Sequence, residues 1–118
     1  MRKESELIDH LKFLGLNEDE ARIYVCLVQN GSGDRRDLLL RLKIKNKSAI
    51  ESLIDKGAVI KDPSNSSKVI PLHPRNVAAN LYKLVQDRAV NELREKRKIA
   101  DRLGMVLEPS FEKSQINR

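Results

Sequence analysis

The sequence predicts a mainly α-helical fold with one small β-hairpin and a long C-terminal helix. Four segments before Gly57 carry apolar residues at the three- and four-residue spacing of amphipathic helices. After Gly57 the pattern changes to two short apolar runs around a turn rich in Ser, Asn and Pro. From Pro74 onward a helical pattern resumes and continues for about 30 residues.

A capping motif separates the first two predicted helices. The first helix covers residues 3–14 and ends at Gly15. Asn17 and Glu20 have the spacing of a capping box, which begins the second helix, and Gly31 ends it. The apolar stripes of the two helices contain Leu7, Ile8, Leu11 and Leu14, then Ala21, Tyr24, Val25 and Val28.

The third predicted helix is short and leads into a polar turn. Residues 31–34 are expected to form a loop, in which Asp34 is a candidate N-cap for a helix over residues 35–42. The turn over residues 43–47 contains three lysines and one apolar residue, Ile44, which we expect to fix it to the core.

The fourth predicted helix ends at Gly57, and either Asn46 or Ser48 caps its start. Ser48 and Glu51 have the spacing of a second capping box, which favours the later start. Ile50, Leu53 and Ile54 are expected to face the core, so the outward positions are Ser48, Glu51, Ser52 and Asp55.

The change of pattern after Gly57 predicts a β-hairpin. Residues 58–61 and 68–72 have the composition of strands, and the six residues between them favour a turn. Pro71 indicates an edge position or the end of the strand.

The long predicted helix covers residues 75–103, and Gly104 and Pro109 mark its decay. Such a helix can fold back on its own domain or pair with another chain. Its apolar stripe is large for a small domain, which favours a coiled coil in a homodimer. The predicted dimer interface consists of Leu81, Val85, Ala89, Leu93, Ala100, Leu103 and Leu107.

This order of elements is that of a winged helix-turn-helix with an appended dimerisation helix. It divides the chain into a domain over residues 1–73, a dimerisation helix over residues 74–107 and a disordered tail over residues 108–118. In this architecture the second helix of the turn motif approaches the major groove, and the hairpin, or wing, contacts the backbone beside it. The predicted partner is therefore double-stranded DNA.

The charge distribution agrees with this prediction. The chain has a formal net charge of +6, and residues 34–47 contain six basic and two acidic side chains, a net +4. Aromatic residues make up 3% of the chain, which argues against a platform for single-stranded nucleic acid. The predicted DNA-binding residues are Arg35, Arg36, Arg41, Lys43, Lys45, Asn46, Lys47, Ser48, Ser52, Lys61, Asn65, Ser66, Ser67 and Lys68.

Two carboxylates on the fourth helix, Glu51 and Asp55, oppose contact with phosphates, although Glu51 can accept from a cytosine amine. We therefore expect the turn, the helix N-terminus and the wing to supply most of the affinity.

Two alternatives stay open. A non-specific architectural DNA-binding protein would show steep salt dependence with little sequence preference. A winged-helix adaptor for protein–protein interaction would not bind nucleic acid even at low salt.

No catalytic, cofactor or metal site is predicted, and the chain is not expected to be an enzyme. His10, His73 and Cys26 lack the spacing of zinc ligands, and no glycine-rich loop for phosphates is present. A single cysteine permits no intrachain disulfide and indicates a reducing compartment. The sequence has no signal peptide and no run of about 20 apolar residues, so we expect a cytoplasmic protein without a membrane partner.

Three segments resemble the TrmB-like transcription regulators of archaea. Residues 11–27 contain LGL, then the capped acidic turn, then EARIY. Residues 53–59 (LIDKGAV) and 70–74 (IPLHP) resemble the end of the recognition helix and the segment after the wing. The resemblance covers most of residues 7–103 and implies a winged-helix DNA-binding regulator that dimerises through its last helix. It is to a short form without the sugar-binding domain of larger members, so no small-molecule effector is predicted.

Overall fold

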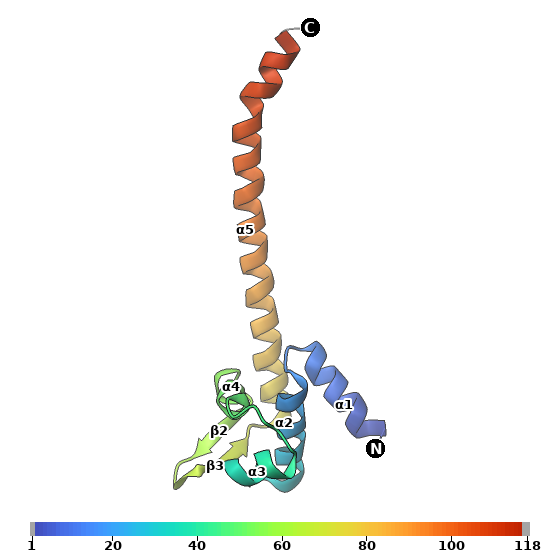
Figure 1. Cartoon of the computed structure of the whole chain (residues 1–118), viewed down its shortest axis with the longest axis vertical. Coiled ribbons are helices and arrows are strands. Elements are labelled where there is room, and N and C mark those ends of the chain that lie inside the picture. Colours follow the sequence, from blue (N-terminus) through green and yellow to red (C-terminus); the bar gives the residue numbers. More distant parts are fainter. Residues whose placement is uncertain (1, 117–118) are drawn as a thin grey trace. The chain divides into compact units, whose positions relative to one another are not determined.

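The computed structural model describes residues 2–116, and the chain forms two units, one ending at Val85 and one beginning at Gln86. As predicted, the fold is mainly α-helical with a small antiparallel sheet. The elements shown in Figure 1 are α1 (Arg2–Phe13), α2 (Glu18–Asn30), β1 (Gly33–Asp34), α3 (Arg35–Arg41), α4 (Ala49–Asp55), β2 (Val59–Asp62), β3 (Asn65–Pro71) and α5 (Pro74–Ile116).

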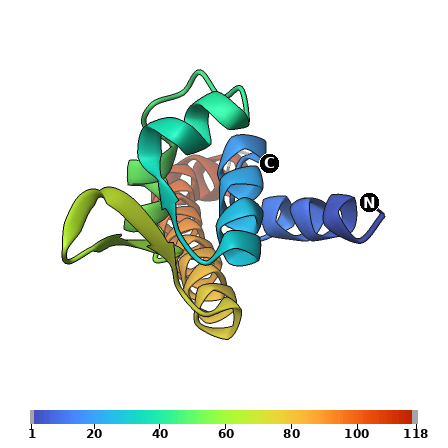
Figure 2. The same ribbon diagram turned by 90° about the horizontal axis from the view of Figure 1, so that it is seen from below.

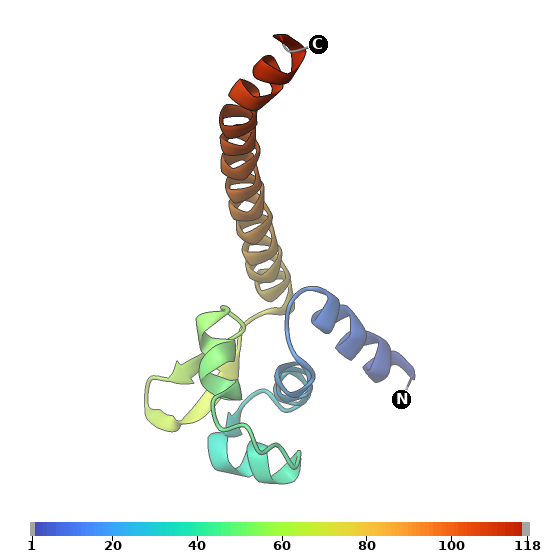
Figure 3. The ribbon, with the colours of Figure 1, turned by 45° about the horizontal axis from the view of Figure 1, so that its top comes forward.

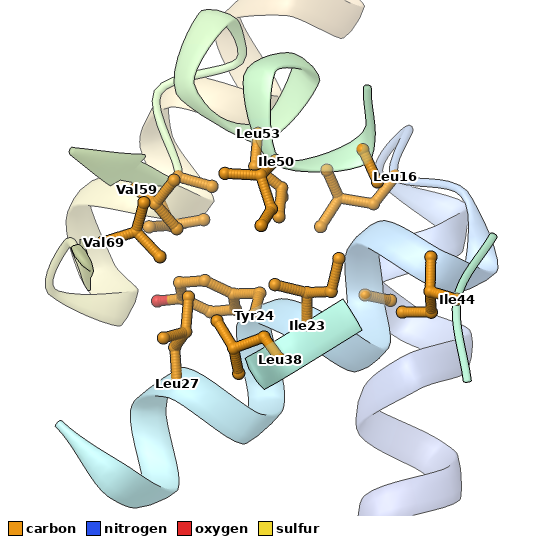
Figure 4. Close-up of a cluster of buried hydrophobic side chains, with 14 of the residues drawn as sticks. Leu16, Ile23, Tyr24, Leu27, Leu38, Ile44, Ile50, Leu53, Val59 and Val69 are labelled. Carbon is orange, nitrogen blue, oxygen red and sulfur yellow. The ribbon is translucent and has the colours of Figure 1, made fainter. Parts of the chain in front are cut away.

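The core of the first unit is built around α2 (Figure 4). Ala21, Ile23 and Leu27 of this helix are fully buried, because α1, α4 and β3 all pack against it. The other elements contribute branched aliphatic side chains, as expected for a chain with few aromatics. These are Leu38 of α3, Ile50 and Leu53 of α4, Val59 and Val69 of the sheet, and Val77 and Leu81 of α5.

The sheet has three strands in the order β1-β3-β2, with both pairs antiparallel. The predicted loop over residues 31–34 is wrong at its end, because Gly33 and Asp34 form β1, with Gly33 opposite Val69. The predicted hairpin is confirmed, with Ile60 opposite Ile70. A two-residue strand has no periodicity of its own, and its partner lies far along the chain, so nothing local in the sequence indicates it.

The predicted capping box at the start of α2 is confirmed. The backbone N–H of Glu20 donates to Asn17 Oδ1 over 2.8 Å, and the backbone N–H of Asn17 donates to Glu20 Oε1 over 2.8 Å. The predicted stop is confirmed too, since Gly31 has a φ of 84° and its N–H donates to the Leu27 carbonyl. Both signals depend on residues within one turn of each other, which is why the sequence alone reveals them.

The same Glu20 links α2 to the end of α4. Its side chain is fully buried and pairs with Lys56 Nζ at 2.8 Å, and Lys56 also donates to the Gly15 carbonyl. Burial is the strongest single influence on the pKa of Glu20 and raises it. The bonds from Asn17, Lys56 and the nearby Ser52, with the charge of Lys56, outweigh burial and lower the pKa below its ordinary value. Glu20 is therefore a buried carboxylate whose ionised form depends on its cation.

The start of α4 agrees with the later of the two predicted positions, but the predicted capping box at Ser48 is wrong. Ser48 has a φ of −84° and a ψ of −3°, and its side chain makes no cap bond. Instead, its hydroxyl and its N–H both donate to Asn46 Oδ1, over 2.6 and 3.1 Å. Glu51 is also unavailable for the box, because it pairs with Arg35. Ser48 thus occupies the N-cap position, and Asn46 holds it in a local turn.

The segment between the sheet and α5 is fixed to α2 by a buried tyrosine. The Tyr24 hydroxyl donates to the Leu72 carbonyl over 2.9 Å, and the Leu72 N–H donates to the Ala58 carbonyl. These bonds connect the end of the hairpin to the helix that forms the centre of the unit.

Helix α5 is longer than the sequence predicts. It runs through Gly104 and Pro109 to Ile116, so the predicted decay and the disordered tail are wrong up to Ile116, and the last two residues lie outside the described ones. The last turns of the helix bend (Figure 1), and Pro109, which removes one helical hydrogen bond, lies in this part. Leu81 is 1% exposed and belongs to the core of the first unit, so its predicted place in a dimer interface is wrong.

Gly57 at the end of α4 is expected to tolerate a side chain less well than Gly31. Both have a positive φ, 77° for Gly57 and 84° for Gly31. A Cβ added at Gly57 would lie 2.7 Å from Asn80 Nδ2, whereas a Cβ added at Gly31 would meet no neighbouring atom within 4 Å. We expect Gly31→Ala to lower the free energy of unfolding by about 1 kcal/mol and Gly57→Ala by about 2 to 3 kcal/mol in urea titrations. Equal losses would show that Asn80 moves aside freely.

Candidate nucleic-acid interface

The turn between α3 and α4 is held so that its three lysines face outward. The buried side chain of Ile44 fixes the turn to the core, as expected, and its N–H donates to the Leu39 carbonyl over 2.9 Å. The Leu42 carbonyl at the end of α3 accepts from Arg22 Nη2 of α2 over 2.8 Å. Lys43 has a φ of 57°, which turns the chain away from α3. Lys43, Lys45 and Lys47 are exposed on this turn.

Helix α4 lies between the β2–β3 hairpin and α2, and α3 lies at the end of this group (Figure 3). The hairpin projects away from the helices, as a wing does (Figure 2). Twelve of the fourteen predicted DNA-binding side chains are exposed, and Arg35 and Ser52 are half-buried. Whether these side chains contact DNA stays a prediction. The exposed ones are Arg36, Arg41, Lys43, Lys45, Asn46, Lys47, Ser48, Lys61, Asn65, Ser66, Ser67 and Lys68.

Ser52 does not lie on the outward face to which the sequence assigned it. It is half-buried, and its hydroxyl is close enough to the buried Glu20 carboxylate to lower the pKa of that group. The helical period places residue 52 between the outward and inward faces of α4, which accounts for its half-burial. The sequence does not show the approach to Glu20, because Glu20 lies on another helix.

The wing tip is ordered by its own polar side chains. The Ser64 N–H and hydroxyl donate to Asp62 Oδ1, which lowers the pKa of Asp62, and the charge of Lys68 adds to this effect. The Ser67 N–H and hydroxyl donate in the same way to Asn65 Oδ1, over 3.1 and 2.7 Å. Two consecutive turns of this kind hold the hairpin in one shape.

A hollow of ≈ 520 Å³ lies between α3 and α4 and is lined by both cationic and apolar side chains. Leu40, which is 78% exposed, forms part of it, although the sequence did not single this residue out. The one indication in the sequence that Leu40 is exposed is its position on the outward face of the third helix. The lining residues are Arg35, Arg36, Leu39, Leu40, Lys47 and Ile50.

An ion pair crosses from α3 to α4 beside this hollow. Arg35 Nη1 lies 2.5 Å from Glu51 Oε1, and this hydrogen bond is the first cause that lowers the pKa of Glu51. The charges of Arg35 and of Lys61 on the wing lower it further. The sequence identified both side chains but not their pairing, because they are 16 positions apart on different helices.

Neither a metal site nor a membrane-crossing helix is found in the described part of the chain. No group of three or more potential metal ligands occurs among residues 2–116. None of the helices described there is both long and apolar enough to cross a membrane.

The arrangement of a three-helix core, a basic turn and a β-hairpin defines a winged helix-turn-helix protein. The family described as sugar-specific transcriptional regulator TrmB matches residues 11–86. The chain therefore belongs to the TrmB family, as the sequence resemblance implied.

Two curated proteins are similar to the chain over most of its length. The DNA-binding HTH-type transcriptional repressor TrmBL2 of Thermococcus kodakarensis is 31% identical over 100 residues, which are 82% of this chain and 38% of that protein. A putative HTH-type transcriptional regulator TrmBL2 of Pyrococcus furiosus matches to the same extent. The chain thus spans 38% of the length of these curated relatives.

A solved structure of TrmBL2 is also similar. It matches with a TM-score of 0.75 and 28% identity, over 91% of this chain and 43% of that one. That protein is described as an archaeal chromatin protein with a novel mode of DNA binding.

Proposed function

We propose that this chain is a DNA-binding transcription regulator that acts as a homodimer and contacts duplex DNA through its basic helix-turn-helix and wing. One observation carries the proposal. The exposed cations of α3 and the following turn lie directly before α4, the helix that this fold presents to the major groove, and Lys61 and Lys68 lie on the adjoining wing. The DNA-binding activity named for the TrmBL2 relatives supports it.

The second unit supports the homodimer. Every side chain described from Gln86 to Ile116 is exposed, including Leu93, Leu103 and Leu107, which are 53–68% exposed. An isolated amphipathic helix with this much free apolar surface is stabilised by pairing. The proposed seam is the predicted stripe without Leu81, extended to Phe111 one turn beyond Leu107. Its members are Val85, Ala89, Leu93, Ala100, Leu103, Leu107 and Phe111.

A non-specific architectural role is the second candidate function. Two observations favour it. The related TrmBL2 structure is described as a chromatin protein, and α4 has only seven residues, two of which, Glu51 and Asp55, are exposed carboxylates. Phosphate contacts from the turn and wing would then supply the affinity without sequence preference.

Replacing Lys43, Lys45 and Lys47 together with Ala is expected to weaken binding to duplex DNA about 30-fold near 0.1 M salt. The slope of log Kd against log salt should fall by about 2 to 3 units, because each phosphate contact releases counterions. Fluorescence anisotropy across a salt series measures both quantities.

The matched control replaces Lys12, Lys98 and Lys113, three exposed lysines outside the helix-turn-helix, the wing and the proposed seam. It removes the same net charge and should change affinity and slope little. Equal losses in the two triple variants would show that total charge, rather than this turn, binds DNA. A wild-type protein that does not bind at low salt would favour the adaptor and overturn the proposal.

A further inference from the structure

We propose that Glu51, held in place by Arg35, is the side chain with which α4 selects cytosine in the major groove. This inference rests on the proposed function, because it assumes that α4 enters the groove. It assigns a base-reading role to a carboxylate whose charge would otherwise only oppose phosphate binding.

The position of Glu51 fits a base contact. It is the third residue of α4, so it lies in the first turn of the helix, where recognition helices contact base edges. Its side chain is 52% exposed, whereas that of its partner Arg35 is 25% exposed. Arg35 is thus the inner member of the pair and Glu51 the outer one. Arg35 Nε is buried, which indicates that the guanidinium is packed against the protein rather than extended into solvent.

The surrounding charges make a carboxylate tolerable at this position. Arg35 bonds to one oxygen of Glu51, and Lys61 acts on the same carboxylate from the wing. The pKa of Glu51 is lowered by these cations, so the side chain is ionised at neutral pH. With Arg36 and Lys47 in the adjoining hollow, the surface around Glu51 stays cationic and still attracts DNA.

The chemistry of an ionised carboxylate identifies the base. A carboxylate only accepts hydrogen bonds, so it needs a donor in the groove. Cytosine presents its N4 amine alone, whereas adenine presents its N6 amine beside the N7 acceptor, which repels a carboxylate. Guanine and thymine present only acceptors and a methyl group on this edge. Because Arg35 engages Oε1, the second oxygen, Oε2, is the one directed to the cytosine amine.

The test compares two alternating duplexes of about two helical turns, one of inosine·cytosine pairs and one of adenine·thymine pairs. Hypoxanthine lacks the 2-amino group of guanine, so the two duplexes carry the same minor-groove groups and differ in the major groove. We expect the wild-type chain to bind the inosine·cytosine duplex about tenfold more tightly. Glu51→Ala should reduce this ratio of affinities to about one. Glu51→Gln should reverse it, because glutamine pairs with adenine.

The matched control is Asp55→Ala, which removes the other exposed carboxylate of α4 without adding an amide that could pair with adenine. It should tighten binding to both duplexes and leave the ratio unchanged.

The same ratio of affinities tests the positioning role of Arg35. Arg35→Gln should reduce the ratio, whereas Arg35→Lys should largely keep it, because lysine can still pair with Glu51. A preference that survives in Glu51→Ala, or a wild-type chain without preference, would overturn the inference. Absence of binding to either duplex would instead overturn the proposed function.

Discussion

Replacing Lys56 with Met is expected to lower the free energy of unfolding by about 3 to 5 kcal/mol. Lys56 Nζ lies 2.8 Å from Glu20 Oε1, and the Glu20 side chain is fully buried. Met occupies a similar volume, so the change removes the cation without opening a large cavity. What remains is a buried carboxylate without its counter-charge, and this is the arrangement in which breaking an ion pair is most destabilising. Urea titration at neutral pH measures the loss.

The pH dependence of this loss distinguishes a charge effect from a packing effect. In the wild-type chain the pKa of Glu20 is below its ordinary value of 4.5, so its stabilising contribution is present above that pH and is lost as the pH falls further. In Lys56→Met, burial is no longer opposed by Lys56 and should raise the pKa of Glu20. Protonation of Glu20 then removes the unpaired buried charge from the variant as the pH falls from 7 to 4. The difference in the free energy of unfolding between the variant and the wild-type chain should therefore shrink.

A double variant supplies the control. Glu20→Gln with Lys56→Met removes both charges, and glutamine can still complete the capping box with Asn17. The double variant should recover most of the lost stability. A Lys56→Met loss that stays constant with pH and persists in the double variant would show that the lysine acts through packing alone.

The features that the sequence predicts correctly depend on residues close together in the chain. The capping box of Asn17 and Glu20 and the stop at Gly31 are each complete within one turn. The features that it misses depend on partners elsewhere. Strand β1 exists because β3 pairs with it, and the predicted capping box at Ser48 does not form because Asn46 and Arg35 engage its two members.

In the candidate interface, too, the features that the sequence predicts are local and the ones it misses depend on distant partners. The cations of α3 and the following turn can be counted in the sequence, and the structure shows all of them except Arg35 exposed. The pairing of Arg35 with Glu51 and the inward position of Ser52 follow only from the packing of α4 against α2 and the sheet. The continuation of α5 past Pro109 was missed because proline disfavours a helix interior, although it does not forbid it.

Replacing Leu93 with Asp is expected to convert the proposed homodimer to monomers and to weaken DNA binding about 100-fold or more. Leu93 is 68% exposed at the middle of the proposed seam of α5. A charge there would have to be buried against the partner helix, which is strongly unfavourable. A monomer engages one half-site and loses the high effective concentration that links two binding events. Sedimentation equilibrium measures the mass, and anisotropy on a two-site duplex measures the affinity.

The control for this change is Met105→Asp. Met105 is 75% exposed on the same helix, and at about 100° per residue it lies on the face opposite the seam. This variant introduces the same new charge and a similar change in helix propensity. If the dimer survives Met105→Asp but not Leu93→Asp, the seam lies on the face of the helix that carries Leu93. If Leu93→Asp stays dimeric, the contact lies elsewhere on the chain. If it is monomeric but binds DNA as tightly as wild type, one copy is sufficient for binding, and the architectural role becomes the better account of the protein.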